Sequence, residues 1–249
     1  MNFINKYKSP NYNYRKKDFF PQYIIIHYTA MRSYIEAINY LCNKKNKVSS
    51  HFLINKLGKI YYLVDVNLRA WHAGNSKWKK NTDLNSSSIG IEIDNSGHHL
   101  DFEAYTTDQL KSLNKLLNYL LTTYQISESN ILGHSDIAPY RKIDPGEKFP
   151  WNNILKFKKI KLPRMSEKKI IIKVESFLKK KLIYKIKNKA LYMLKEIGYD
   201  IGLAKKNNKY YLLLIKAYQM HFRQDCPDGN LDGETYKILI NHYNQTLTR

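Results

Sequence analysis

Residues 23–29 have the sequence "YIIIHYT". Three consecutive isoleucines between tyrosines form a short apolar run, rich in the β-branched and aromatic side chains that favour strands. Such a run is typical of a strand in a largely buried sheet. The sequence therefore predicts a core strand here, and a histidine, His27, stands near its end.

Similar apolar runs follow this strand along the chain. They occupy residues 51–54, 59–64, 88–93 and 130–134, and each is bounded by Gly, Asn, Asp or Pro. Leucines at 110, 113, 117 and 120 follow helical spacing, and Thr106 with Gln109 forms a capping box before them. A second helix is predicted over 33–43. Strands mixed with helices indicate an α/β fold with a mixed central β-sheet flanked by helices.

The character of the sequence changes after residue 150. Apolar residues there recur with helical spacing in the segments 169–182, 189–199, 209–222 and 234–244, whereas residues 156–169 show no periodicity. We therefore expect an α/β domain at 1–158, a linker at 159–168 and a small all-helical, three-helix domain at 169–249.

Composition limits the classes of protein that this chain can be. A hydrophobic content of 43% indicates a folded protein, and no apolar run approaches the roughly 20 residues of a membrane span. The net charge of +21 comes mainly from lysine. Specific nucleic-acid binders more often use arginine, so the charge favours non-specific attraction to acidic polymers. Cys42 and Cys226 are too far apart to suggest a disulfide framework.

The loop "HSDIAPYRKIDPG" at 134–146 carries the polar groups of a site. A lone histidine on a strand is more often a core residue than a ligand, but His27 and His134 both end predicted strands, where sites gather in α/β sheets. Together with Asp144 they would give zinc three protein ligands and leave the fourth position to water. That open arrangement is the one that catalytic zinc adopts.

Two further residues complete a catalytic set. Glu92 alternates with isoleucines in "SIGIEI", and a carboxylate on an apolar strand needs a partner or a purpose. Acting as general base on a zinc-activated water would supply one. Lys142 precedes Asp144 by two residues and, in an extended loop, would point the same way, so that it could stabilise an oxyanion.

Five motifs in matching order resemble the zinc-dependent N-acetylmuramoyl-L-alanine amidases of the AmiD/AmpD type, relatives of peptidoglycan-recognition proteins. They are "IIIHYTA", "SSHFLI", "AWHAGNSKW", "SIGIEIDN" and "GHSDIAPYRKIDPG". The resemblance implies that one zinc ion is held by His27, His134 and Asp144 and that Glu92 and Lys142 are catalytic. It also implies cleavage of the amide between N-acetylmuramic acid and L-alanine in peptidoglycan or muropeptides, with the intact and the 1,6-anhydro sugar both open.

The same motifs imply a substrate-binding region. Trp71 and His72 are expected in the cleft wall, and Tyr140 and Arg141 in the catalytic loop. Tyr140 departs from the Gly or Gln typical of such relatives. The other histidines are expected to have structural, packing or surface roles, and His51 is not expected to bind zinc.

The tail from about 170 to 245 resembles the small peptidoglycan-binding domain often attached to such amidases, most strongly over 215–240. Two alternatives stay open at this point: a non-catalytic peptidoglycan-recognition protein of the same fold, and a zinc peptidase that acts on the peptide stem. The retained ligands favour the amidase. A monomer is expected. A wall-binding tail favours the cell envelope, which is the expected location; the cytoplasm is the alternative, because the amino terminus shows no signal peptide.

Overall fold

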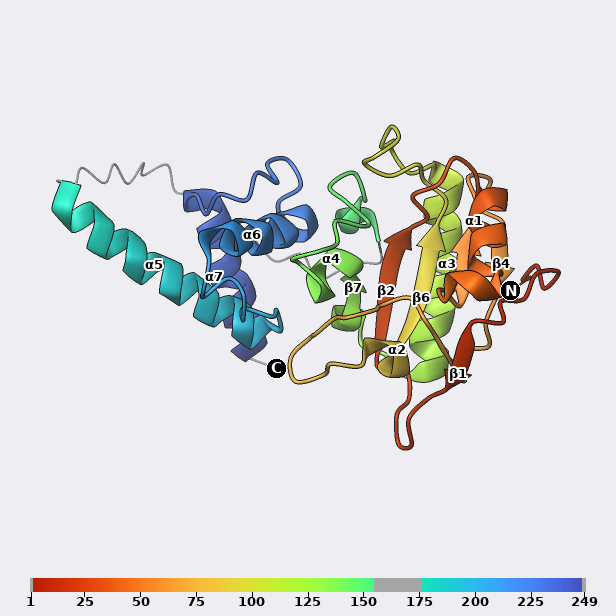
Figure 1. Ribbon diagram of the computed structural model, residues 1–249. Coiled ribbons are helices and arrows are strands. Elements are labelled where there is room, and N and C mark those ends of the chain that lie inside the picture. Colours follow the sequence, from red (N-terminus) through yellow and green to blue (C-terminus); the bar gives the residue numbers. More distant parts are fainter. Residues whose placement is uncertain (1, 155–175, 248–249) are drawn as a thin grey trace.

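The computed structural model describes residues 2–154 and 176–247, with the backbone alone for 176–183. Its centre is a five-stranded sheet in the order β4-β3-β6-β2-β7 (Figure 1). The predicted core strand is β2 (Tyr23–Tyr28), which pairs in parallel with β6 (Ser88–Ile93) and with β7 (Ile131–Gly133). Strand β3 (Phe52–Ile54) is parallel to β6, and β4 (Ile60–Tyr62) is antiparallel to β3. All five predicted strands are confirmed.

A second, two-stranded sheet was not predicted. Strands β1 (Tyr12–Tyr14) and β5 (Leu68–Ala70) pair antiparallel. Each is three residues long and largely exposed or half-buried, so neither shows an apolar run. The remaining short elements are η1 (Lys44–Asn46), α2 (Leu84–Ser87), η2 (Glu128–Asn130), α4 (His134–Ile137) and η3 (Trp151–Asn153).

Alternation along β2 sends its side chains into two separate cores. Ile24 and Ile26 pack on one face with the buried leucines of α3 (Thr107–Tyr124). The predicted capping box of Thr106 and Gln109 begins that helix. Tyr23 and Ile25 face the opposite side. The strand therefore reads as continuously apolar because both of its faces are covered.

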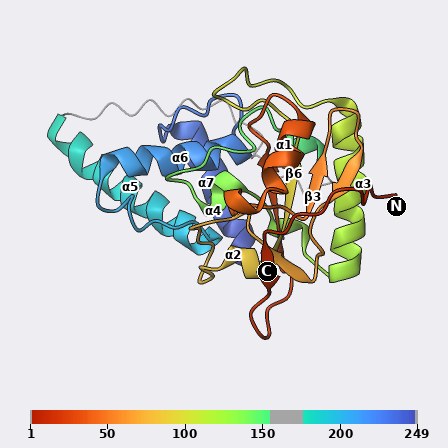
Figure 2. The same cartoon turned by 45° about the vertical axis from the view of Figure 1, so that its right-hand side comes forward.

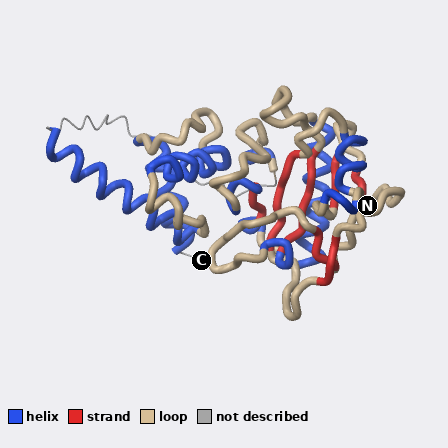
Figure 3. Tube along the Cα trace, in the orientation of Figure 1, coloured by secondary structure: helices blue, strands red, loops and turns tan. Residues whose placement is uncertain are grey.

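Helices α1 (Tyr34–Leu41) and α4 lie on the other face, together with three carboxy-terminal helices. These three are α5 (Ser176–Ile197), α6 (Asn208–Phe222) and α7 (Gly233–Leu247). The three-helix prediction is confirmed, and the described part of the first periodic segment of the tail lies with most of the second in the single helix α5. Figure 3 shows the strands gathered in one part of the molecule and only helices and loops in the other.

The carboxy-terminal helices share a hydrophobic core with the sheet. Ile25 of β2 and Leu132 of β7 belong to the same cluster of buried side chains as Leu194 of α5 and Leu214 of α6. Helix α4 lies between the sheet and α6, as Figures 1 and 2 both show. The expected linker at 159–168 lies outside the described residues. None of the helices in the described part of the chain combines the length and the apolar character needed to cross a bilayer.

Candidate active site

The register of β2 against β6 brings two of the predicted site residues side by side. His27 is paired with Glu92 across the two parallel strands. Residues paired in this way project from the same face of a sheet. That face is the one toward α1 and α4, because Ile26 and Ile91, which directly precede His27 and Glu92, point to the opposite face, toward α3. Both side chains therefore stand at the carboxyl end of the sheet, where α/β folds place their sites.

The third and fourth residues come from the loop after β7. The sequence predicts His134 at the end of a strand, but β7 ends one residue earlier at Gly133. His134 is instead the first residue of α4. The backbone N–H of Ser135 donates to the carbonyl of Asp144 at 2.9 Å. This contact folds the loop back on itself, so that Asp144 lies beside His134 although ten residues separate them.

Three side-chain atoms converge at this point. The Nδ1 atoms of His27 and His134 are 2.9 Å apart, and each lies 3.0 Å from Oδ2 of Asp144. All three residues are buried, with 2%, 3% and 6% of their surface exposed. In the part of the chain that the structure describes, they form a group of potential metal ligands.

The second nitrogen of His27 shows which atom carries its proton. The carbonyl of Leu84 can only accept, so the hydroxyl of Ser88 donates to it. Ser88 Oγ then accepts from Nε2 of His72 at 3.3 Å, which leaves Nδ1 of His72 to accept from Nε2 of His27 at 3.0 Å. Because the His27 proton is on Nε2, its Nδ1 presents a lone pair to the site.

His134 has the same arrangement by a shorter route. Its Nε2 lies 3.1 Å from the carbonyl of Ala73, which can only accept a proton. Arg141 donates to the same carbonyl. Arg141 Nη2 also lies 3.3 Å from Nε2 of His134, but the carbonyl is nearer, so we infer that Nε2 carries the proton and that Nδ1 presents a lone pair.

These three atoms fit a zinc ion. Two imidazole lone pairs and a carboxylate oxygen that face one another at 2.9–3.0 Å repel unless a cation lies between them. In a tetrahedral site with metal–nitrogen distances of 2.0–2.1 Å, neighbouring ligand atoms are about 3.3 Å apart. The observed spacing is slightly tighter than that value. Nitrogen ligands with one carboxylate suit zinc, and three protein ligands leave a coordination position open.

Burial and charge set the protonation of this group. Burial, and then the neighbouring His134, lower the pKa of His27 to about 4. Burial alone would raise the pKa of Asp144, but His134 and His27 outweigh it and hold that pKa well below its usual range. A neutral histidine and an ionised carboxylate are the forms that bind a metal.

Glu92 is poised differently from Asp144. Its Oε2 atom is enclosed and has no hydrogen-bond partner among the described residues. Burial, and then the charge of Asp144, raise the pKa of Glu92 well above its usual value, while Lys142 lowers it. A carboxylate with a raised pKa and an unpaired buried oxygen is suited to proton transfer. Lys142 is half-buried, and its charge also acts on His27.

The sequence predicts His72 in the wall of the cleft, but the structure buries this side chain. It is 6% exposed, and its ring packs behind His27. Gly90 of β6 makes room for this ring, because a Cβ atom at that position would lie 2.4 Å from it. Trp71 is half-buried, and its Nε1 donates to Oδ1 of Asn13 at 2.8 Å.

The other two expected substrate contacts hold the loop to the rest of the molecule. Arg141 donates from Nε to the carbonyl of Asn75 at 2.8 Å and from Nη2 to that of Ala73. The hydroxyl of Tyr140 donates to the carbonyl of Asp200 at 2.5 Å, and its ring packs edge-on against Tyr210. Tyr140, the departure from related sequences, therefore contacts the carboxy-terminal helical region.

Sequence reasoning did not single out Asp136, Ser88 or Tyr199. Asp136 stands two residues after His134 in the quoted loop, and its charge among buried neighbours was the available signal. The partners of Asp136 were not recognisable, because they lie 63 and 85 residues further along the chain.

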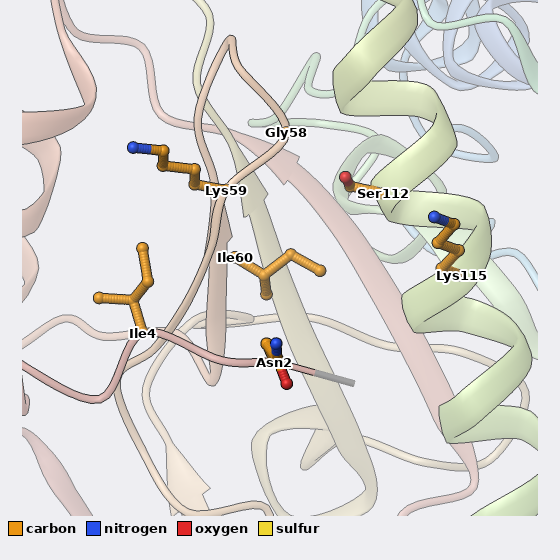
Figure 4. Close-up of a pocket in the computed structure, with 7 residues that line it drawn as sticks. All are labelled: Asn2, Ile4, Gly58, Lys59, Ile60, Ser112 and Lys115. Carbon is orange, nitrogen blue, oxygen red and sulfur yellow. The ribbon is translucent and has the colours of Figure 1, made fainter.

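Two hollows in the surface lie away from the histidine pair. One, of about 480 Å³, is drawn in Figure 4 and lies between the amino terminus, the β3–β4 turn and α3. Its lysines, Lys59 and Lys115, point in different directions in that view. The other, of about 580 Å³, lies between η2, β7 and the helices α5 to α7. None of the predicted site residues lines either hollow.

Comparison with known proteins shows which family has a similar sequence. Residues 16–147 match the family model described as N-acetylmuramoyl-L-alanine amidase. The N-acetylmuramoyl-L-alanine amidase AmiD of Escherichia coli is 32% identical over 239 residues, which cover 89% of this chain and 83% of the relative.

Solved structures agree with the sequence match over nearly the whole chain. AmiD from E. coli, in complex with the substrate anhydro-N-acetylmuramic acid-L-Ala-D-γ-Glu-L-Lys, superposes with a TM-score of 0.75 at 28% identity and covers 93% of this chain and 92% of its own. AmpDh3 from Pseudomonas aeruginosa, in complex with anhydromuramic pentapeptide, gives a TM-score of 0.72 at 28% identity and 96% coverage of both chains. The similarity therefore includes the helices α5 to α7 as well as the sheet.

Proposed function

This chain belongs to the family of N-acetylmuramoyl-L-alanine amidases and has that activity, and on this premise we propose that it works with one zinc ion held by His27, His134 and Asp144. The observation that carries the proposal is the convergence of three lone-pair atoms within 2.9–3.0 Å, with Glu92 in register beside His27. When bound there, zinc would act as a Lewis acid that polarises the amide carbonyl and acidifies water.

The side chains of the protein supply the remaining steps. Glu92 accepts the proton of the attacking water, which its raised pKa favours, and then delivers that proton to the leaving nitrogen of L-alanine. Lys142 stabilises the negative charge that develops on the amide oxygen. His72 and the carbonyl of Ala73 keep both imidazoles turned so that their Nδ1 atoms face the reaction.

The substrate is peptidoglycan or its fragments. We propose that the 1,6-anhydro form of N-acetylmuramic acid is accepted, because two structurally similar proteins bind anhydromuramyl peptides. The test is mass spectrometry of the products from anhydro-N-acetylmuramic acid-L-Ala-D-γ-Glu-L-Lys and from the same peptide on an intact sugar. Free sugar and a peptide that begins with L-alanine support the amidase; shortened peptides still attached to the sugar would identify a peptidase instead.

We also propose that helices α5 to α7 bind the wall polymer, as the resemblance of the tail to a peptidoglycan-binding domain suggests. Charge alone could attach a protein of net charge +21 to an acidic wall. Pull-down of Glu92→Gln protein on intact sacculi at 0.1 M and 1 M salt separates the two causes, since the Debye length falls from about 10 Å to about 3 Å. Binding that persists at high salt supports a shaped site, and binding that disappears shows charge alone.

For the location we propose the cell envelope, where intact wall polymer is found, and for the functional unit a monomer. Fractionation of cells that express the full-length protein tests the first, and the cytoplasm is the competing result. Sedimentation of the purified chain tests the second.

A further inference from the structure

A buried carboxylate links the metal-ligand loop to the carboxy-terminal helices. Asp136 lies in α4, two residues after His134, and is 1% exposed. Its Oδ2 accepts from the backbone N–H of Gly133 at 2.7 Å and from Nδ1 of His221 at 2.7 Å. Its Oδ1 accepts from the hydroxyl of Tyr199 at 2.5 Å. Two of its three donors thus come from the carboxy-terminal region.

These contacts are strong for their type. Hydrogen bonds to an ionised acceptor are roughly twice as strong as neutral ones, and a buried carboxylate that loses a donor bears the full cost of its desolvation. Tyr199 follows the end of α5 and His221 lies in α6. Through these two hydrogen bonds, the helical region holds a single side chain of α4, that of Asp136, in place.

The far end of the same loop is held by the same helices. The rings of Trp151 and His221 stack with centroids 3.7 Å apart and an interplanar angle of 14°. Gln224, just after α6, donates from Nε2 to the carbonyls of Glu147 and Phe149. The segment that carries His134, Lys142 and Asp144 is therefore fixed at both ends by residues beyond 198.

The loop transmits this hold to the ligand atoms. His134 and Asp136 share the single turn of α4, so fixing one fixes the direction of the other. The bond from Ser135 N–H to the carbonyl of Asp144 carries the hold across the loop to the carboxylate ligand. Metal affinity depends on ligands held at their binding positions before the metal arrives.

We propose that Tyr199 and His221 are positioning residues for the amidase reaction: through Asp136 they hold His134 and Asp144 at the spacing that the metal requires. The carboxy-terminal helices then complete the active site, in addition to any role in binding the wall. This inference rests on the proposed function, since it presumes a metal at His27, His134 and Asp144.

The test compares Tyr199→Phe, His221→Leu and His221→Asn in the full-length protein. Tyr199→Phe keeps the ring, which packs on Trp78 and Tyr218, and removes one donor. His221→Asn can place its amide nitrogen where Nδ1 stood and is the conservative rescue of His221→Leu. Tyr211→Phe is the matched control, because Tyr211 is a buried tyrosine of the same helical core and no hydrogen bond joins it to the loop in the described part of the chain.

Zinc affinity, measured by competition with a chelator, separates positioning from general stability. Loss of a residue that orients a metal ligand typically costs about 10- to 100-fold in affinity or activity. We expect that loss for Tyr199→Phe and His221→Leu, with a lower kcat and an unchanged KM for a soluble muropeptide. His221→Asn should recover most of the affinity, and Tyr211→Phe should match the wild type.

Variants that unfold at a lower temperature but keep wild-type zinc affinity and kcat would overturn the inference, because the contacts would then be structural only. Tyr199→Phe decides the matter even where His221→Leu fails to fold. A wild-type protein that binds no zinc would contradict the proposed function instead, so the two failures are distinguishable.

Discussion

The Nε2 atom of His27 lies 3.0 Å from Nδ1 of His72, while its Nδ1 atom faces His134 and Asp144. The two nitrogens of one ring thus have separate tasks. A partner on the outer nitrogen fixes both the tautomer and the ring plane, and such partners raise the basicity of a metal-binding histidine. His72 is therefore expected to act through His27 and not on the substrate.

Replacing His72 tests this assignment. We expect His72→Ala to weaken zinc binding by about 10- to 100-fold, since the His27 ring loses its acceptor. His72→Asn can offer Oδ1 where Nδ1 stood and should recover part of the loss. Chelator competition measures both. If His72→Ala raised KM for the muropeptide and left zinc affinity unchanged, His72 would be a substrate contact after all.

Glu92 should be separable from metal binding. Because its enclosed Oε2 has no partner among the described residues and its pKa is raised, we expect Glu92→Gln to keep zinc and lose turnover. Loss of a general base typically costs about 10²- to 10⁴-fold in rate. Zinc content and kcat are measured on the same sample. A rate near that of the wild type would place the base elsewhere, and loss of zinc would make Glu92 a ligand.

Lys142 should affect both the rate and its pH dependence. Its charge lowers the pKa of Glu92, so Lys142→Ala should raise that pKa further. The acid limb of the pH–rate profile should then move to higher pH, and kcat should fall by roughly 10²- to 10³-fold if the oxyanion loses its stabilising cation. Lys115→Ala, on the surface of α3, is the control. If the rate fell but the acid limb of the pH–rate profile did not move, Lys142 would have no electrostatic influence on Glu92.

Acid should destabilise the metal-free fold through His51. Burial, and then the charge of Arg15, lower the pKa of His51 from 6.5 to about 3. Between these two pH values the unfolded chain binds a proton that the folded chain excludes. The stabilisation is therefore complete above about pH 6.5 and is lost as the pH falls toward 3, at up to about 1.4 kcal/mol per pH unit.

Urea unfolding of the zinc-free protein from pH 7 to pH 4.5 measures this slope. His27 and His72 contribute to it in the same direction, since their pKa values are also lowered. Replacing His51 by Asn leaves those contributions in place. It should reduce the slope of the unfolding free energy against pH by the equivalent of about one proton, or up to about 1.4 kcal/mol per pH unit. Identical slopes for the two proteins would show that His51 becomes protonated in the folded state.

The sequence predicts most of the sheet because its strands are short, apolar and separated by turn residues. The triple isoleucine of β2 has one interpretation, whereas β1 and β5 have no apolar pattern and were missed. His27, Glu92, His134 and Asp144 could be placed together because strand ends and one stiff loop position them. The partnership of His27 with His72 could not, because it depends on a ring fitting over Gly90.

The position of the carboxy-terminal helices could not be read from the sequence either. Helical periodicity reveals which residues form an apolar face, but not that Leu194 and Leu214 pack in one cluster with Ile25. His221 was expected to be a surface or packing residue, and its bond to Asp136 follows only from the folded chain. Polar contacts between residues far apart in the sequence leave no periodic signal.

In the proposed mechanism, the three converging atoms of His27, His134 and Asp144 hold the metal that this amidase uses. Metal analysis of the purified protein after dialysis against a weak chelator tests it most directly. We expect about one zinc per wild-type chain and little in His134→Ala, with the amidase activity lost in parallel. Equal zinc in the two proteins would contradict it.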